Sequence, residues 1–404
     1  MRDCSIIKLS NGIRIVHQYI PTTQIVHCGI FLGVGSRDET PANQGIAHFW
    51  EHMAFKGTRR RKAFHIINSL DAVGGELNAY TDKERVVFYA SVRNEHLGRA
   101  VDILSDITFH SIFPENEIEK ERGVILEEMA MYMDDPDDTL QDEFEHALYG
   151  NHPLGMNILG TPQSVRSFRR RDFKSFVKSN LSTDKIVFSC IGNVTRERVE
   201  QLATQYFEPL PTVKVRKRRK KFSVYQPTEK ILERPVKQAK CAFGRDAFSL
   251  HHADRIPFYL LTNILGGPGM NSRLNLALRE RRGYVYSVEA VYVPYSDTGM
   301  FAVFFGTKPR QLDRCISLVK KEMAQLADKP LSQRQLHAAK EQVIGQLAIA
   351  EENNLSLMMM MGRTVLDFGR VPSLVEIFDT IADTKALKLQ QLARTMFDEK
   401  RMSA

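Results

Sequence analysis

The stretch His48-Phe49-Trp50-Glu51-His52 contains three side chains of the kinds that hold and use a metal ion. In a helix, residues at positions i, i+3 and i+4 lie on one face. His48 and His52 can therefore offer two imidazoles to one ion, with Glu51 beside them. Zinc binds neutral imidazole, and a catalytic zinc site usually has three protein ligands and a water. The stretch predicts a helix with a zinc site, where Glu51 can take a proton from water.

The order of these residues is His-x-x-Glu-His, the inverse of the commoner zincin order and the signature of the inverzincins. A third ligand must come from elsewhere in the chain. The best candidate segment is 121–128, a helical-looking run in which Glu121 and Glu128 lie two turns apart on one face. Glu127 is an alternative to Glu128. Either residue can be a solvated glutamate on the helix surface, so the helical pattern alone does not choose between them.

Sequence around the motif extends the pattern. His52 is followed by Glu128 after 76 residues (128 − 52 = 76). Three further segments accompany them: Gly45-Ile46-Ala47, Lys56-Gly57-Thr58 and Gly74-Gly75-Glu76-Leu77-Asn78-Ala79-Tyr80-Thr81. Over nearly its whole length the chain resembles the pitrilysin/insulysin family, specifically its mitochondrial-processing-peptidase-like branch. The resemblance implies one zinc ion per chain, with roles for five residues: metal ligands His48, His52 and Glu128, general base Glu51 and supporting carboxylate Glu121.

An internal repeat indicates two similar halves. Residues 88–92 lead into a helical pattern that includes Leu97, and residues 301–305 lead into one that includes Leu312, a shift of 215 (312 − 97 = 215). The second half has no counterpart of the metal residues. At the aligned positions it has Ser272, Asn275 and Leu276.

Strand patterns followed by runs of helix predict an α+β fold. The resemblance implies two homologous α/β halves, each an antiparallel sheet packed with helices, that face each other as a clamshell. We expect a zinc-binding catalytic domain at 1–210, a basic linker at 211–225 and a homologous domain without metal site at 226–404. The second half ends at Ala404, where the counterpart of the strand at 186–192 is expected.

The resemblance also assigns residues that act on the substrate. It implies that Arg279 and Tyr286, an Arg followed seven residues later (286 − 279 = 7) by a Tyr, stabilise the oxyanion. Residues 266–269 resemble a glycine-rich substrate loop, although Pro268 departs from the usual glycine. Asn78-Ala79 resembles the start of an edge strand that binds an extended peptide by β-addition.

Composition limits the cellular setting. The chain is 43% hydrophobic and 26% charged, as in an ordinary globular protein. No apolar run approaches the ~18 residues of a membrane span, and the N-terminus lacks the features of a secretory signal. Five scattered cysteines without a C-x-x-C pair favour reduced thiols. We therefore predict a cytoplasmic protein without a membrane partner.

The net charge of +8 comes largely from residues 214–221. A basic run of this length is typical of a nucleic-acid patch or of a solvated linker. No aromatic residues interleave it, and it lies between two segments that each look like a folded unit. We expect a solvated linker and no nucleic-acid partner.

The sequence favours a zinc metalloendopeptidase that cleaves extended peptides or unfolded segments inside an enclosed chamber. The alternative is a non-catalytic family subunit that acts as a scaffold or peptide-binding partner, but such subunits typically lose metal ligands. The resemblance further implies a dimer, either a homodimer or a heterodimer. In that dimer each active site takes its metal from one subunit and its Arg279/Tyr286 pair from the other.

Overall fold

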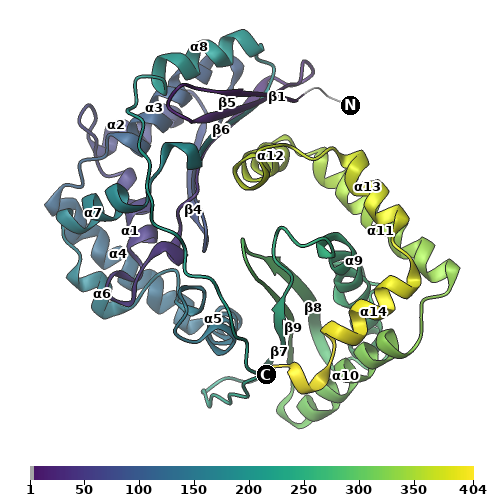
Figure 1. The fold of residues 1–404 in the computed structure, drawn as a ribbon. Helices are drawn as coiled ribbons and strands as arrows, with labels where there is room; N and C mark the ends of the chain where they lie inside the picture. Colours follow the sequence, from purple (N-terminus) through teal and green to yellow (C-terminus); the bar gives the residue numbers. More distant parts are fainter. Residues whose placement is uncertain (1–3) are drawn as a thin grey trace. The chain divides into compact units, whose positions relative to one another are not determined.

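Residues 4–404 are described by the computed structural model of this chain. They divide into two compact units, each formed by three segments. Unit 1 comprises the chain up to residue 131 together with 156–219 and 349–372, and unit 2 comprises 132–155, 220–348 and 373–404. Each unit has one β-sheet and a set of helices (Figure 1). The predicted α+β class with two sheet-containing halves is confirmed.

The sheet of unit 1 has the strand order β1-β2-β6-β3-β5-β4, which places β4 at one edge. Neighbouring strands are antiparallel, except that β2 and β6 are parallel. The expectation of a purely antiparallel sheet is therefore wrong for this pair, since a long stretch of chain separates β2 from β6 and no hairpin sets their relative direction. The strands are β1 (Cys4–Lys8), β2 (Arg14–Tyr19), β3 (Ile25–Leu32), β4 (Glu76–Thr81), β5 (Val86–Arg93) and β6 (Ile186–Gly192).

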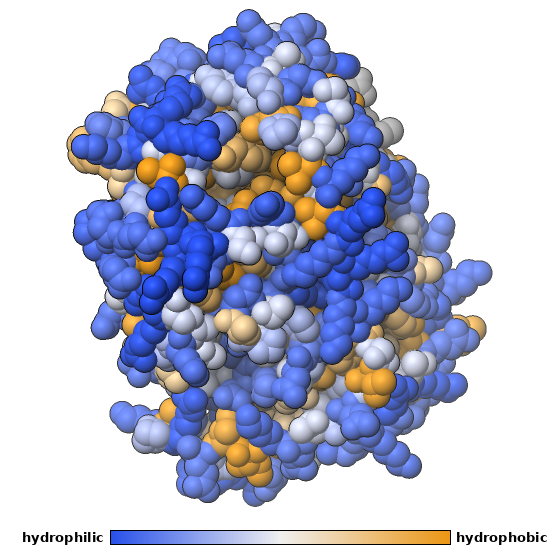
Figure 2. All heavy atoms as spheres, turned by 60° about the vertical axis from the view of Figure 1, so that its left-hand side comes forward, coloured by the Kyte–Doolittle hydropathy of each residue, from blue (hydrophilic) through white to orange (hydrophobic). Residues whose placement is uncertain are grey.

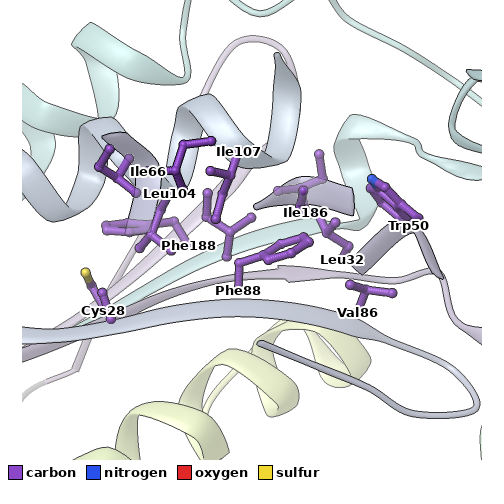
Figure 3. Packing of buried hydrophobic residues seen from close by; sticks show 14 of the residues in the cluster. Cys28, Leu32, Trp50, Ile66, Val86, Phe88, Leu104, Ile107, Ile186 and Phe188 are labelled. Atoms are coloured by element: carbon purple, nitrogen blue, oxygen red, sulfur yellow. The ribbon is translucent and has the colours of Figure 1, made fainter. Parts of the chain in front are cut away.

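A large apolar core lies between this sheet and the helices of unit 1 (Figure 3). Trp50, Phe88 and Phe188 are almost completely buried in it. The amphipathic pattern that begins at Leu97 forms α3, whose apolar stripe faces the same core. The helices are α1 (Ile46–Ala54), α2 (Ala63–Asp71), α3 (Leu97–Phe109), α4 (Glu115–Asp134), α6 (Pro162–Ser167), α7 (Arg170–Asn180) and α8 (Arg196–Tyr206).

A second apolar layer covers the sheet of unit 1 with α12 (Asn354–Phe368), which packs on β3 and β6 (Figure 1). Met358, Met361 and Val365 are buried there, and the Ser189 hydroxyl donates a hydrogen bond to the carbonyl of Met358 at 2.9 Å. Gly362 faces the buried ring of Phe31 so closely that a side chain has no room. The close packing of α12 on this sheet therefore requires glycine at position 362.

The sheet of unit 2 has three antiparallel strands in the order β7-β9-β8. Near the end of the chain, Ser403 pairs with Gly244 of β7 through two backbone hydrogen bonds of 3.0 and 2.7 Å. The expected counterpart of β6 is thus present as a single bridge. The elements are β7 (Ala239–Ala247), β8 (Val285–Pro294), β9 (Gly299–Thr307), α5 (Pro136–Tyr149), α9 (Arg255–Gly266), α10 (Leu312–Asp328), α11 (Gln333–Glu351), α13 (Leu374–Asp383) and α14 (Ala386–Met396).

Two helices, α12 and α5, each pack on the sheet whose strands are farther from them in the sequence. α12 follows the second sheet in the chain but belongs to unit 1, and α5 precedes the linker but packs on β7 in unit 2. The units therefore do not follow the continuous boundaries 1–210, 211–225 and 226–404. Periodicity shows that such segments are amphipathic helices, but it does not show which sheet covers their apolar faces.

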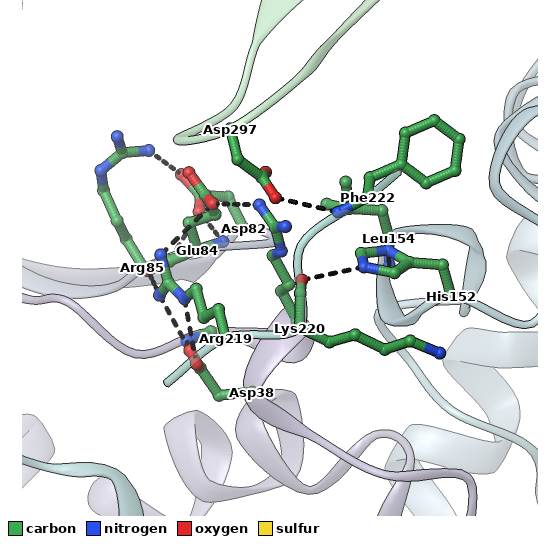
Figure 4. Close-up of polar contacts among 12 residues, drawn as sticks. Asp38, Asp82, Glu84, Arg85, His152, Leu154, Arg219, Lys220, Phe222 and Asp297 are labelled. Atoms are coloured by element: carbon green, nitrogen blue, oxygen red, sulfur yellow. Dashed lines mark hydrogen bonds and ion pairs between the residues drawn. The ribbon is translucent and has the colours of Figure 1, made fainter. Parts of the chain in front are cut away.

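Arg219 in the basic segment is not a solvated cation. Arg219 is half-buried in unit 1, where its guanidinium donates to Asp38 at 2.8 and 3.0 Å and lies 3.3 Å from Glu84 (Figure 4). It also donates to the carbonyls of Gly33 and Glu84. The expectation of a solvated linker is wrong at Arg219, since opposite charges on folded elements bind this side chain.

Hydrophilic residues cover most of the face drawn in Figure 2, and hydrophobic residues appear there in small groups. Within residues 4–404, no helix combines the length and the apolar character needed to cross a membrane.

Replacing Gly362 by Ala is expected to destabilise unit 1. The new methyl group would lie 2.2 Å from the nearest ring atom of Phe31, which is fully buried. We expect a loss of about 1–3 kcal/mol in the free energy of unfolding, the range for overpacked cores. Gly123 in α4 has no neighbour within 4 Å of such a methyl, so Gly123→Ala is the control and should gain up to ~1 kcal/mol. Urea unfolding measures both, and equal stability of the two variants would contradict the packing.

Candidate metal centre

The start of α1 is fixed by a buried carboxylate. Glu39 accepts hydrogen bonds from the backbone N–H groups of Gly45 and Ala47, both at 2.8 Å. Gly45 has a φ of +91°, and a Cβ there would lie 2.4 Å from the carbonyl oxygen of Leu159. Only glycine fits this position, which explains the glycine three residues (48 − 45 = 3) before the metal motif.

His48 and His52 lie on one face of α1 and point toward α4. The Nε2 atom of His48 lies 3.7 Å from Oε1 of Glu128, and Nε2 of His52 lies 3.5 Å from Oε2 of the same carboxylate. The potential ligand atoms of the three residues all lie within 4.8 Å of one another. The neighbouring Glu127 is exposed, so of the two glutamates the structure brings Glu128 to the histidines.

These distances fit a zinc ion. Ligand atoms of a tetrahedral zinc with bonds of about 2.0–2.1 Å lie about 3.3 Å apart, close to the separations of Glu128 from both histidines. Burial, aided by neighbouring His52, lowers the pKa of His48 to about 3. Its imidazole is therefore neutral near pH 7, as a metal ligand must be.

A second glutamate of α4 orients His52. Oε1 of Glu121 lies 3.0 Å from Nδ1 of His52, which leaves Nε2 directed at Glu128. Lys56 contacts the other oxygen of Glu121 at 2.6 Å. Burial alone would lower the pKa of His52, but the hydrogen bond with Glu121 and nearby carboxylates outweigh it and raise that pKa. Such a carboxylate–histidine pair fixes the tautomer and makes the ligand nitrogen more basic.

Glu51 lies on the same helix as the candidate ligands His48 and His52, and a residue of β4 contacts it. The hydroxyl of Thr81 donates a hydrogen bond of 2.6 Å to Oε2 of Glu51. Burial raises the pKa of Glu51, although Thr81 opposes the shift. A carboxylate with a raised pKa takes up a proton more readily, as a general base at neutral pH must.

Asn78 and Ala79 lie on β4, paired with Tyr89 and Phe88 of β5. β4 is the last strand of its sheet among the described residues, so no strand pairs with its other side. The strand also packs beside α1. An open strand edge therefore lies next to the helix that carries Glu51.

Arg279 and Tyr286 come together in unit 2. The Arg279 guanidinium carbon lies 5.9 Å from the centre of the Tyr286 ring, within cation–π range, and Tyr286 is 85% exposed. Arg279 lies in a short π-helix, Asn275–Glu280. A cavity of about 730 Å³ adjoins both side chains and the glycine-rich segment 266–269, and Asp137 and Asp138 of α5 line it too.

Several contacting residues had no predicted role. Thr81 and Lys56 lie inside the segments on which the family resemblance rests, so the sequence marked their surroundings as functional. It did not show that they contact Glu51 and Glu121. Glu39 lies nine residues before His48 (48 − 39 = 9) in an irregular segment with no recognisable pattern. Its hydrogen bonds to α1 exist only in the folded chain.

Known proteins resemble this chain over most of its length. The family model Insulinase (Peptidase family M16) matches residues 14–162, and the model Peptidase M16 inactive domain matches residues 167–343. A Bacillus subtilis (strain 168) protein named uncharacterized zinc protease YmxG is 35% identical over 393 residues, which are 96% of this chain and 94% of that protein. An uncharacterized zinc protease of Rickettsia bellii (strain RML369-C) is 33% identical over 98% of this chain and 96% of its own length.

Solved structures share the fold. The peptidase M16 inactive domain from Pseudomonas fluorescens superposes with a TM-score of 0.92 at 17% identity, covering 99% of this chain and 96% of that one. A protease from Helicobacter pylori gives 0.91 at 19% identity, covering 100% and 98%. This chain therefore belongs to peptidase family M16, the pitrilysin-like zinc proteases.

Purified protein is expected to bind about one zinc ion per chain, and His52→Ala is expected to lose most of it. The substitution removes a ligand at a half-buried position, so the fold should persist. His65→Ala, at an exposed position of α2, is the control. Metal analysis after dialysis gives the zinc content, and far-UV circular dichroism checks the fold. Full zinc occupancy in His52→Ala would refute the ligand assignment.

Glu121→Gln is expected to weaken zinc binding about 10- to 100-fold without removing a ligand, the usual effect of losing a carboxylate behind a metal-binding histidine. Glu119→Gln, on the same helix but 69% exposed in its side chain, should bind zinc like the wild type. Competition with a chelator of known affinity measures both. Equal affinities would show that the Glu121–His52 contact does not tune the site.

Proposed function

We propose that this protein is a zinc-dependent endopeptidase that cleaves extended peptides or unfolded segments. The observation that carries the proposal is the convergence of His48, His52 and Glu128 within 4.8 Å, with Glu51 on the same helix. Two neutral-capable imidazoles and a carboxylate are a catalytic zinc donor set. The zinc proteases among the relatives support the same reaction class.

Glu51 is the proposed general base. A bound zinc ion supplies Lewis acidity, which makes water a stronger acid and a peptide carbonyl a better electrophile. Glu51 takes the proton from the attacking water and then passes it to the leaving amine. Its raised pKa favours the first transfer, in which the carboxylate takes up the proton.

The open edge of β4 is the proposed substrate site. An extended peptide that pairs with Asn78 and Ala79 makes hydrogen bonds through its backbone, so binding tolerates many sequences. β4 packs beside α1, and this proximity supports delivery of a scissile bond to Glu51. A folded domain has no free extended segment for such pairing, which favours peptides and unfolded chains as substrates.

Arg279 and Tyr286 are the proposed oxyanion donors, and we propose that they act on the metal centre of the opposite subunit in a dimer. The ligands lie in unit 1 and this pair lies in unit 2. Their adjacency and the exposure of Tyr286 leave the phenol hydroxyl accessible to a substrate. The chain keeps a complete ligand set, which argues against a non-catalytic scaffold subunit.

Glu51→Gln is expected to retain zinc and lose nearly all peptidase activity. The amide keeps the shape and accepts the Thr81 hydrogen bond but cannot take a proton. General-base catalysis contributes typically 10²–10⁴-fold, so activity above about a tenth of wild type would contradict the role. Glu127→Gln, at the exposed neighbour of Glu128, serves as control and should be fully active. Peptide digestion with mass-spectrometric mapping of the cut sites measures the rates and the cleavage preference together.

Mixing Glu51→Gln subunits with Tyr286→Phe subunits is expected to restore about a quarter of wild-type activity. If sites are shared across a twofold dimer, each mixed dimer has one doubly altered site and one intact site. Random exchange makes about half of the dimers mixed. If each chain completes its own site, every site keeps one lesion and no activity returns.

A further inference from the structure

Consecutive side chains of β4 reach opposite faces of the sheet of unit 1. Thr81 bonds to Glu51 of α1 on one face. Tyr80 belongs to the apolar layer on the other face, beneath α12. This alternation is the normal pleat of a strand. A two-residue stretch at the end of β4 is thus held from both sides at once.

The contact on the α12 face is an Arg–Tyr pair. The guanidinium of Arg363 donates two hydrogen bonds to the phenol oxygen of Tyr80, at 2.8 and 3.0 Å, and its carbon lies 5.2 Å from the ring centre. One turn later on α12, Asp367 pairs with Arg85, the residue before β5. α12 therefore contacts the β4–β5 hairpin at two residues, Tyr80 and Arg85, which lie close to Thr81 in the sequence.

On the α1 face, Thr81 fixes the position of one carboxylate oxygen of Glu51, the proposed general base. The Thr81 hydroxyl is the only hydrogen-bond donor to Glu51 among the side-chain contacts of the described residues. A glutamate side chain has three rotatable bonds, and its terminal torsion is broad. Without the hydroxyl, the carboxylate has no fixed partner to select the orientation that faces the ligands.

We propose that Thr81 is a positioning residue for Glu51, and that the Tyr80–Arg363 pair holds Thr81 in place from the opposite face. The inference rests on the proposed function, because Glu51 is the base only if the protein is a peptidase. The same strand that receives the peptide then also aims the base. A segment from the far end of the chain, α12, thereby takes part in catalysis without touching the substrate.

Thr81→Val tests the hydroxyl. Valine has nearly the same shape and suits a strand, so the fold and zinc content should stay unchanged. We expect kcat to fall about tenfold, as for one lost hydrogen bond to a charged group, with KM within about twofold of wild type. Thr81→Ser keeps the hydroxyl and should restore most of kcat.

Thr108→Val is the matched control, since it removes a buried hydroxyl in α3 that bonds only to the carbonyl of Leu104. It should leave kcat unchanged. If Thr81→Val has wild-type kcat, or if Thr81→Ser fails to restore it, the positioning role of Thr81 is wrong.

Arg363→Met tests the contact between α12 and Tyr80 on the opposite face of the sheet. We expect kcat to fall about threefold with zinc content unchanged, and Arg363→Lys to recover part of the loss. Since Arg363 acts through Thr81, the double variant Thr81→Val/Arg363→Met should have the kcat of Thr81→Val alone. Losses that multiply in the double variant would show that Arg363 does not act through Thr81 and would overturn that part of the proposal.

Glu51→Gln, assayed in parallel, separates this inference from the proposed function. If Glu51→Gln is inactive and Thr81→Val is fully active, the peptidase assignment stands and the positioning role falls. If wild-type protein loaded with zinc cleaves no peptide, both fall.

Discussion

The position of α1 is the constraint on which the candidate metal centre depends, and a buried carboxylate sets it. Glu39 caps the first N–H groups of the helix, and Gly45 lets the chain turn into it against Leu159. Burial raises the pKa of Glu39 to about 8, while the hydrogen bonds from Ala47 and Gly45 oppose the shift. A slip of α1 by one residue would turn His48 away from Glu128.

Charged contacts from remote segments surround this part of unit 1. Arg219, the last residue of the unit 1 segment 156–219, binds Asp38, which directly precedes Glu39. Asp367 of α12 binds Arg85 on the hairpin that carries Thr81. These pairs are partly or largely shielded from water, where opposite charges interact more strongly than on an open surface. The residues next to Glu39 and Thr81 are thus bound to segments near the points where the chain passes between the two units.

Much of the fold was predictable because its signals are local. The apolar period that begins at Leu97 formed α3, and the repeat at a shift of 215 (312 − 97 = 215) matched two sheets with similar helices. The parallel pairing of β2 with β6 was not predictable, since no turn joins them. The packing partner of α12 was not predictable either, because a methionine-rich stripe can pack on any apolar sheet face. The close contact of Gly362 with Phe31 exists only in the folded chain.

The sequence by itself determined which chemical groups are available: two imidazoles and a carboxylate at helical spacing, and a glutamate two turns from another on a second helix. Spacing along one helix is fixed by its geometry, so the face shared by His48 and His52 needed no tertiary information. The family resemblance already favoured Glu128 over Glu127. Only the tertiary structure placed Glu128 beside the histidines, joined Thr81 to Glu51 and buried Arg219 against Asp38. These contacts join residues distant in sequence, and their energies depend on distance and burial, which no local pattern encodes.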